Sequence, residues 1–304
     1  MIRMNVVKTI VTYAVIVVVA AALAAPGAFW LCQVSGIDWL AGQPFHRICD
    51  RTLLATALIG LWPLLRCVGV RSWRDLGYAP VPRWWRQTLI GFGLGFGSLA
   101  LAGAFSLLLG ARTFRLAPNL PISLLKYLGV GALVAVIEET FFRGAIQGTL
   151  QRVWSGVAAV LMTSFVYAVL HFVRAPYFDI SSGAVHWNTG FVYLATAVSE
   201  PAHKPGMLVA LVTLSLAGCN LGWAFAKTRV LYLAIGLHAG WVFTMKMYSV
   251  LTTATVAPQP RWLGAERLTE NITTWPVLLL LLAVITWWCR HDLDPSTTSG
   301  NSPA

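Results

Sequence analysis

The chain has 304 residues, of which 57% are hydrophobic and only 11% are charged. Soluble domains carry about 25% charged residues, so this composition excludes a soluble protein and predicts an integral membrane protein. The formal net charge of +11 does not indicate a nucleic-acid partner, because the cations are scattered beside apolar runs and form no basic segment. Anionic lipid head groups are the partner that this distribution favours.

Apolar runs of about 20 residues are long enough to cross a bilayer. They predict an all-α polytopic bundle with about eight transmembrane spans. The first run exceeds the apolar core of a signal peptide and further spans follow it, so we expect a retained anchor. The approximate bounds of the predicted spans are 10–31, 52–70, 88–109, 124–150, 156–174, 207–226, 230–250 and 274–289.

The spans group into three predicted parts. Residues 1–120 hold about three spans, residues 121–250 form a core of about four, and residues 251–304 contain an extramembrane loop, the last span and a disordered tail. Lys and Arg are more frequent in the loops on the side of the N-terminus, which predicts that both termini are cytoplasmic in a cell inner or plasma membrane. The five cysteines show no CxxC spacing and predict neither a disulfide framework nor a nucleophile.

The stretch VAVIEETFFRGAIQGTL (134–150) places Glu138, Glu139 and Arg143 inside an apolar run. Ionised groups at membrane depth are costly, so they usually face a bundle interior or a wet cavity and pair with one another. Glu139 and Arg143 are four residues apart, which predicts an ion pair within one helix. Glu138 lies about 100° around that helix, so the two carboxylates cannot share the arginine equally. The alternative is that both glutamates pair with Arg143 and only hold the helix in place.

Two histidines occur in other apolar segments. His171 ends SFVYAVLHF, one turn after Tyr167, and His238 lies within LYLAIGLHAGWVF. Together with Glu138 they predict a buried polar site. A carboxylate beside an imidazole can take a proton from water, while a second imidazole donates to the oxyanion that develops at a carbonyl. Glu138, His171 and His238 could instead bind zinc, which in catalytic sites has three protein ligands and an open position.

Three motifs resemble those of the CAAX prenyl endopeptidase type II family, also called the CPBP family of intramembrane proteases and bacteriocin-processing proteins. EETFFR resembles its EExxxR motif, and YAVLH is similar to its FxxxH motif. GLHAGWV resembles the third motif, a histidine followed four residues later by a polar residue. The three occur in the family's order and spacing between residues 124 and 245. The resemblance therefore identifies residues 121–250 as a CPBP-like catalytic core.

The resemblance also implies roles for single residues. Glu138 and His171 would activate water and His238 would help to form the oxyanion site, while Glu139, Arg143 and the aromatic Tyr167 would support them.

One position departs from the family. Val242 stands where the family has a second oxyanion donor, and valine cannot donate. Asn220, in the preceding span, is the candidate to replace that donor.

The predicted bounds leave one geometric tension. If the spans begin at 124 and 156 and run in opposite directions, Glu138 lies near mid-membrane while His171 lies about 22 Å along its helix. A tilt, or a later start of the second helix, has to reconcile the two positions.

We therefore predict an intramembrane endopeptidase that hydrolyses a peptide bond of a membrane-associated protein or peptide. The glutamate mechanism requires no cofactor, and the alternative is one divalent metal, zinc first. A lipid-modified substrate is compatible with the family but is not fixed by these residues. The rival function is a non-catalytic scaffold, immunity factor or transporter that uses the same polar cluster. Val242 favours this rival, but a transporter would show paired repeats with broken helices, which the sequence lacks.

Overall fold

The structure is a computed structural model that describes residues 2–116, 119–173, 178, 180–199, 206–255 and 267–292. The predicted disordered tail, 294–304, and residues 256–266 of the predicted extramembrane loop lie outside the described residues.

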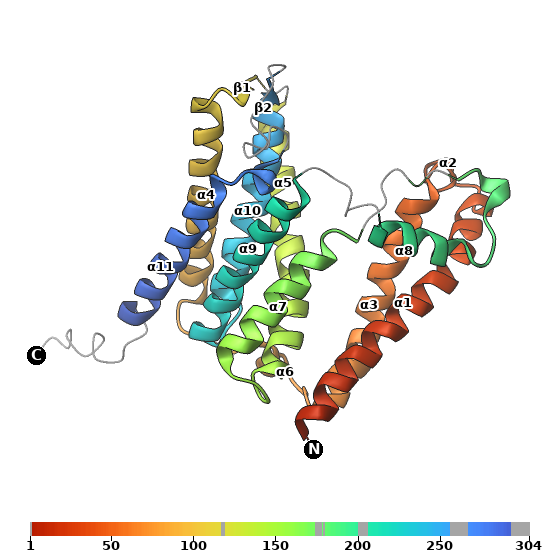
Figure 1. The fold of residues 1–304 in the computed structure, drawn as a ribbon, viewed down its shortest axis with the longest axis horizontal. Helices are drawn as coiled ribbons and strands as arrows, with labels where there is room; N and C mark the ends of the chain where they lie inside the picture. The colour runs from red at the N-terminus through yellow and green to blue at the C-terminus, as the bar shows by residue number, and fades with distance from the viewer. Residues whose placement is uncertain are drawn as a thin grey trace, which may run out of the picture. The chain divides into compact units, whose positions relative to one another are not determined.

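Helices make up nearly all of the described chain, which confirms the all-α prediction (Figure 1). The α-helices are α1 (Ile2–Val34), α2 (Asp38–Ala41), α3 (Phe45–Cys67), α4 (Trp84–Leu108), α5 (Leu120–Glu139), α6 (Gly148–Leu150), α7 (Gly156–Leu170), α8 (Thr189–Ser199), α9 (Met207–Thr228), α10 (Tyr232–Leu251) and α11 (Thr274–Asp292). The shorter elements are the 3-10 helices η1 (Trp73–Leu76), η3 (Ser182–Ala184) and η5 (Leu268–Glu270), the π-helix η2 (Thr140–Gln147), and the strands β1 (Arg112–Phe114) and β2 (Thr252–Ala254).

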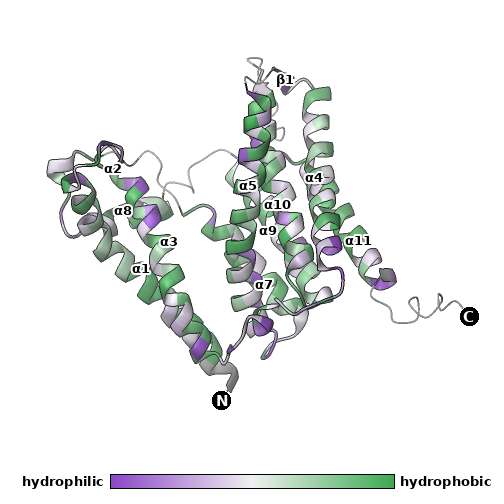
Figure 2. Cartoon of the chain, turned by 180° about the vertical axis from the view of Figure 1, so that it is seen from behind, coloured by the Kyte–Doolittle hydropathy of each residue, from purple (hydrophilic) through white to green (hydrophobic). Residues whose placement is uncertain are grey.

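Six described helical segments are long and apolar enough to cross a membrane, so the chain is a multi-pass membrane protein. They are Val6–Val34, Phe45–Cys67, Trp84–Leu108, Leu120–Leu150, Met207–Thr228 and Thr274–His291. Figure 2 shows hydrophobic residues along most of the length of these helices. The two other predicted spans are present as α7, with 15 residues, and α10, with 20 residues, but they are not among the six.

The chain divides into two compact units. The first contains residues 1–71 and 169–207, and the second contains residues 72–168 and 208–304. This division differs from the boundaries that the sequence suggested, because the segment between α7 and α9 packs with the N-terminal helices. The unit that carries the polar residues of the predicted site therefore begins before α4.

In the first unit, α1 packs along α3, and α8 packs on both helices. A cluster of aromatic rings joins these elements: Phe45 packs edge-on against Phe29 and Tyr193. The hydroxyl of Tyr193 donates a hydrogen bond to Asp50 at 2.5 Å. This bond explains why a carboxylate is tolerated inside α3, which begins seven residues before the predicted span at residue 52.

In the second unit, α10 lies between α4 and α5 and has its closest neighbour in α4. Glycines spaced four apart allow this approach, as in other membrane helix pairs. A Cβ at Gly91 or Gly95 of α4 would overlap carbonyl oxygens of α10, and a Cβ at Gly236 or Gly240 of α10 would overlap carbonyl oxygens of α4. His238 lies between the two glycines of α10, so this close contact fixes the height of the histidine in the unit.

The buried core of this unit contains side chains from α4, α9, α10 and α11, including Leu221, Leu237 and Ile285. At one end β1 and β2 pair antiparallel, with Arg112 opposite Ala254, and join the segments that follow α4 and α10. The strands thereby fix the two helices at their ends as well as along their length.

We expect Gly95→Ala to destabilise the protein, because the added methyl group would collide with the Leu237 carbonyl and push α4 away from α10. Gly97→Ala is the matched control, since nothing lies within 4 Å of a Cβ at that position of the same helix. Thermal unfolding of the purified variants measures the difference. Equal melting temperatures for the two variants would show that the close contact between these helices is not needed.

Candidate active site

The site is built around the C-terminal end of α5, where Glu138 and Glu139 are followed directly by the π-helix η2. π-helical turns are rare and often occur at functional sites. Arg143 Nη1 lies 3.2 Å from Glu139 Oε1, and both side chains are fully buried. The ion pair predicted from the four-residue spacing is therefore present.

The buried face of η2 is held against α9 by two further hydrogen bonds. Arg143 Nη2 donates to the carbonyl oxygen of Gly218 at 3.2 Å, and Gln147 Nε2 donates to that of Gly222 at 2.8 Å. The two donor residues are four positions apart, and so are the two acceptor residues, so successive turns of η2 and α9 are bonded to each other. Glycine at position 218 leaves room for Ser164, which a Cβ would approach to 2.9 Å, and a Cβ at Gly222 would displace the end of the Gln147 side chain.

His238 of α10 makes the second contact with Glu139. Its Nδ1 lies 2.7 Å from Glu139 Oε1, and both groups are buried. Because Glu139 is already paired with Arg143, it acts as a hydrogen-bond acceptor, and Nδ1 of His238 donates. The other ring nitrogen, Nε2, is thereby presented to the opposite side. Such a carboxylate contact orients an imidazole in many catalytic sites.

Glu138 lies on that opposite side. Its Oε2 is 3.8 Å from His238 Nε2. This distance is too long for a direct hydrogen bond. The Glu138 side chain is 29% exposed, whereas that of Glu139 is 0% exposed. Of the two carboxylates, Glu138 is therefore the more exposed, although its Oε2, which faces His238, is itself buried.

Tyr167 of α7 also lies in this cluster. The Arg143 guanidinium carbon is 4.6 Å from the centre of the Tyr167 ring, which is a cation–π contact. The ring stands edge-on to His238, with 6.3 Å between ring centres, and edge-on to Phe142 at 5.2 Å. Tyr167 thus packs against both the arginine and the histidine of the site.

A small cavity reaches His238 and Tyr167 from the side of α9 and α11. Its volume is about 40 Å³, which is room for a water molecule or a small apolar group. The walls are mostly apolar, and the turn around Thr269 together with Leu278 of α11 forms one side. The cavity therefore depends on residues beyond the predicted catalytic core.

His171 follows the end of α7 in an exposed turn. α7 begins at Gly156, so the later start considered from the sequence does not occur. The boundary between the two units falls between Ala168 and Val169, and His171 belongs to the first unit. The structure brings Glu138, Glu139, Arg143, Tyr167 and His238 together, whereas His171 is described with the other unit.

Asn220 and Val242 are both buried. The Asn220 amide nitrogen donates to the carbonyl oxygens of Leu216 and Leu278, at 2.9 and 3.1 Å. These bonds fasten α9 to α11 and use both amide hydrogens, so Asn220 is not available as the donor that would replace Val242.

The zinc alternative needs a third ligand beside Glu138 and His238. Among the described residues, no group of three or more His, Cys, Asp or Glu side chains could hold a metal ion. The donor atoms of the second unit alone therefore do not make up a zinc site.

Sequence reasoning missed Gln147 and its partner Gly222, although their spacing from Arg143 and Gly218 is a readable signal. It also missed Tyr78, which follows η1. Thr140 donates to the Val136 carbonyl, so Tyr78 donates to Thr140 Oγ1, at 2.6 Å. Burial raises the pKa of Tyr78, which keeps this hydroxyl protonated as a donor beside the glutamates.

A scan against family models identifies one matching region, residues 120–244, about two fifths of the chain. The comparisons with curated proteins and with solved structures found no match. The matched region extends from the start of α5 into α10 and includes all three motifs. The matching model describes Rce1-like type II CAAX prenyl endopeptidases, and the match confirms that this region resembles that family, as the motifs predicted.

Proposed function

We propose that this protein is an intramembrane endopeptidase that hydrolyses a peptide bond with water activated by Glu138. The supporting observation is the position of Glu138 Oε2, 3.8 Å from a His238 ring nitrogen whose partner nitrogen is held by the buried Glu139. One carboxylate orients the imidazole, and the other is left part-exposed for chemistry. The family match supports the same class of reaction.

The reaction begins with a water molecule that donates a hydrogen bond to the Glu138 carboxylate. Glu138 takes a proton from the water as its oxygen attacks the peptide carbonyl carbon. His238, with a proton on each ring nitrogen, donates from Nε2 to the oxyanion and from Nδ1 to Glu139. When the tetrahedral intermediate collapses, the C–N bond breaks and Glu138 returns its proton to the leaving amine. The products are a carboxylic acid and an amine, and no covalent intermediate with the enzyme forms.

The charges of the cluster support this assignment. The formal charges of Glu138, Glu139 and Arg143 sum to −1, which the imidazolium that this mechanism uses would balance. Glu139 Oε2 and Arg143 Nε have no hydrogen-bond partner within the described ranges. Incompletely satisfied buried groups are more typical of a working site than of a purely structural ion pair.

The substrate that fits this site is a membrane-associated protein or peptide. Because the cavity beside His238 is small and apolar, we expect a small apolar side chain next to the cleaved bond. A lipid-modified substrate is proposed from the family description alone. We keep His171 as the proposed second imidazole that activates the water, because the order of the motifs implies it. Zinc is the alternative, and His171 would then be its third ligand beside Glu138 and His238.

The test compares cells that make the protein with cells that make Glu138→Gln at the same level, by mapping newly generated peptide termini in the membrane proteome. New termini found only with the unaltered protein would support proteolysis and identify the substrate. Identical maps would contradict the proposal, and if Glu138→Gln also kept its function in the host, the scaffold alternative would be favoured.

Val242→Asn is expected to raise the turnover number at least about tenfold, because removal of an oxyanion donor costs about 10²- to 10³-fold and asparagine restores one. Val242 lies one helical turn after His238. Val242→Leu, which adds no donor, is the control for packing. Turnover of the identified substrate is the measurement, and equal rates in the two variants would show that position 242 does not face the oxyanion.

A further inference from the structure

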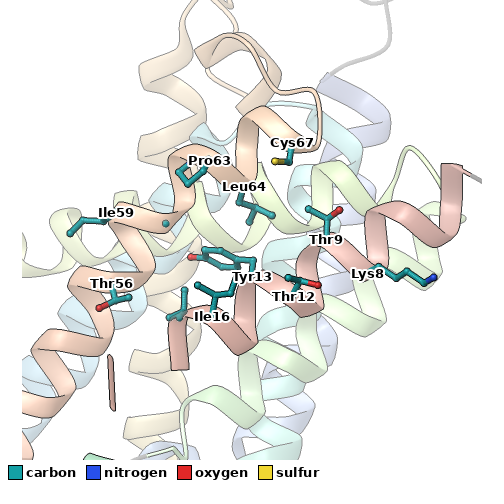
Figure 3. A pocket seen from close by; sticks show the side chains of 12 residues that line it. Lys8, Thr9, Thr12, Tyr13, Ile16, Thr56, Ile59, Pro63, Leu64 and Cys67 are labelled. Atoms are coloured by element: carbon teal, nitrogen blue, oxygen red, sulfur yellow. The ribbon is translucent and has the colours of Figure 1, made fainter. Parts of the chain in front are cut away.

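A groove with a volume of about 500 Å³ lies between α1 and α3 in the first unit (Figure 3). Its walls are mostly apolar, and both helices contribute to it. None of its residues takes part in the proposed chemistry. Its lining includes Lys8, Tyr13, Ile16, Ile59, Pro63 and Cys67.

The groove is made by two residues of α3. Gly60 leaves space for the Tyr13 ring, because a Cβ at this position would lie 3.0 Å from Tyr13 Cε2. The hydroxyl of Tyr13 donates to the Ala57 carbonyl at 2.6 Å and so fixes the ring across the gap. Pro63 has no amide hydrogen to bond the Ile59 carbonyl, which weakens α3 at this point. The small Gly60 and the fixed ring of Tyr13 therefore define the shape of the groove.

The two ends of the groove differ in polarity. Figure 3 shows Lys8, Thr9 and Cys67 at one end, and Ile59 and Thr56 at the other. Lys8 is the only charged residue of the lining, and no described carboxylate belongs to it.

A second cation lies next to the polar end. Arg66 precedes Cys67, and its guanidinium carbon is 4.5 Å from the centre of the exposed Trp62 ring. Tryptophan and basic residues together are typical of a helix end at the membrane surface.

We propose that this groove binds one acyl chain of an anionic phospholipid, with the head group at Lys8. The apolar body suits a hydrocarbon chain, and the positive end matches a phosphate. A phospholipid is favoured over a peptide because the lining offers a long apolar surface with charge at one end only. The site is separate from the proposed protease and does not depend on it.

Native mass spectrometry of the purified full-length protein tests the proposal, after extraction from vesicles that contain equal amounts of phosphatidylglycerol and phosphatidylcholine. We expect one retained phosphatidylglycerol per chain. Lys8→Gln should reduce its retention about fivefold, the effect expected for one cation near a membrane surface. Arg86→Gln, which removes an exposed cation outside the groove, is the matched control.

Cys67 provides a second readout, because it lines the groove and is the only exposed thiol of the chain's five cysteines, all of which are described. Phosphatidylglycerol should slow its alkylation relative to phosphatidylcholine vesicles, and Lys8→Gln should remove most of that difference. Equal retention of both lipids, an unchanged Lys8→Gln variant, or retention of a free fatty acid or a peptide instead would each overturn the proposal.

Discussion

Glu138→Gln is expected to slow peptide-bond hydrolysis by about 10²- to 10⁴-fold, the usual contribution of a general base. Glutamine keeps the shape of the side chain but cannot take a proton from water. Because Glu138 is part-exposed and Arg143 is paired with Glu139 instead, the substitution should leave the fold intact. Turnover of the substrate identified by terminus mapping gives the rate, and thermal unfolding of the same preparation confirms the fold.

Glu270→Gln is the matched control for this experiment. The side chain of Glu270 is 28% exposed, nearly the same as that of Glu138, but it belongs to η5 and pairs with Arg267 at 3.9 Å. We expect its turnover to equal that of the unaltered protein. If Glu138→Gln also retained full turnover, the general base would have to be another group and the proposed mechanism would be wrong.

Arg143→Ala is expected to lower the free energy of unfolding by about 3 to 5 kcal/mol, the cost of removing one partner from a buried ion pair. Three contacts are lost at once: those with Glu139, with the Gly218 carbonyl and with the Tyr167 ring. The Glu139 carboxylate then stays fully buried without its cation. Equilibrium unfolding in mixed detergent micelles measures the change.

The double variant Glu139→Gln/Arg143→Ala separates charge from packing. Since glutamine leaves no buried carboxylate, the double variant should be more stable than Arg143→Ala alone. Arg86→Ala, at an exposed position of α4, controls for the loss of a surface arginine and should change stability little. Equal stabilities of Arg143→Ala and Arg86→Ala would refute the structural role of the ion pair.

Much of the fold was predictable because apolar length is a strong signal in membrane proteins. The first predicted span lies inside α1, and the last, 274–289, nearly coincides with α11. The errors occurred where polar residues enter helices. α3 begins before Asp50, because Tyr193 of a distant segment bonds the carboxylate, and no local pattern reveals such a partner.

The sequence predicted most of the residues that meet in the site, but it did not predict all of the contacts between them. The four-residue spacing correctly gave the ion pair of Glu139 and Arg143. It did not show that Glu139 also holds His238, because that contact joins residues 99 positions apart. The π-helix was also missed, since its sequence, TFFRGAIQ, has no feature that distinguishes it from an ordinary helical turn.

The close glycine contact between α4 and α10 implies that the matched region, residues 120–244, does not fold by itself. α4 ends at Leu108, before the region begins at residue 120, yet it is the closest neighbour of the helix that carries His238. A protein cut to residues 120–244 would expose the glycine face of α10 and lose part of the core. The family signature therefore marks a set of reactive side chains, whereas the smallest unit that can fold around them also includes α4 and α11.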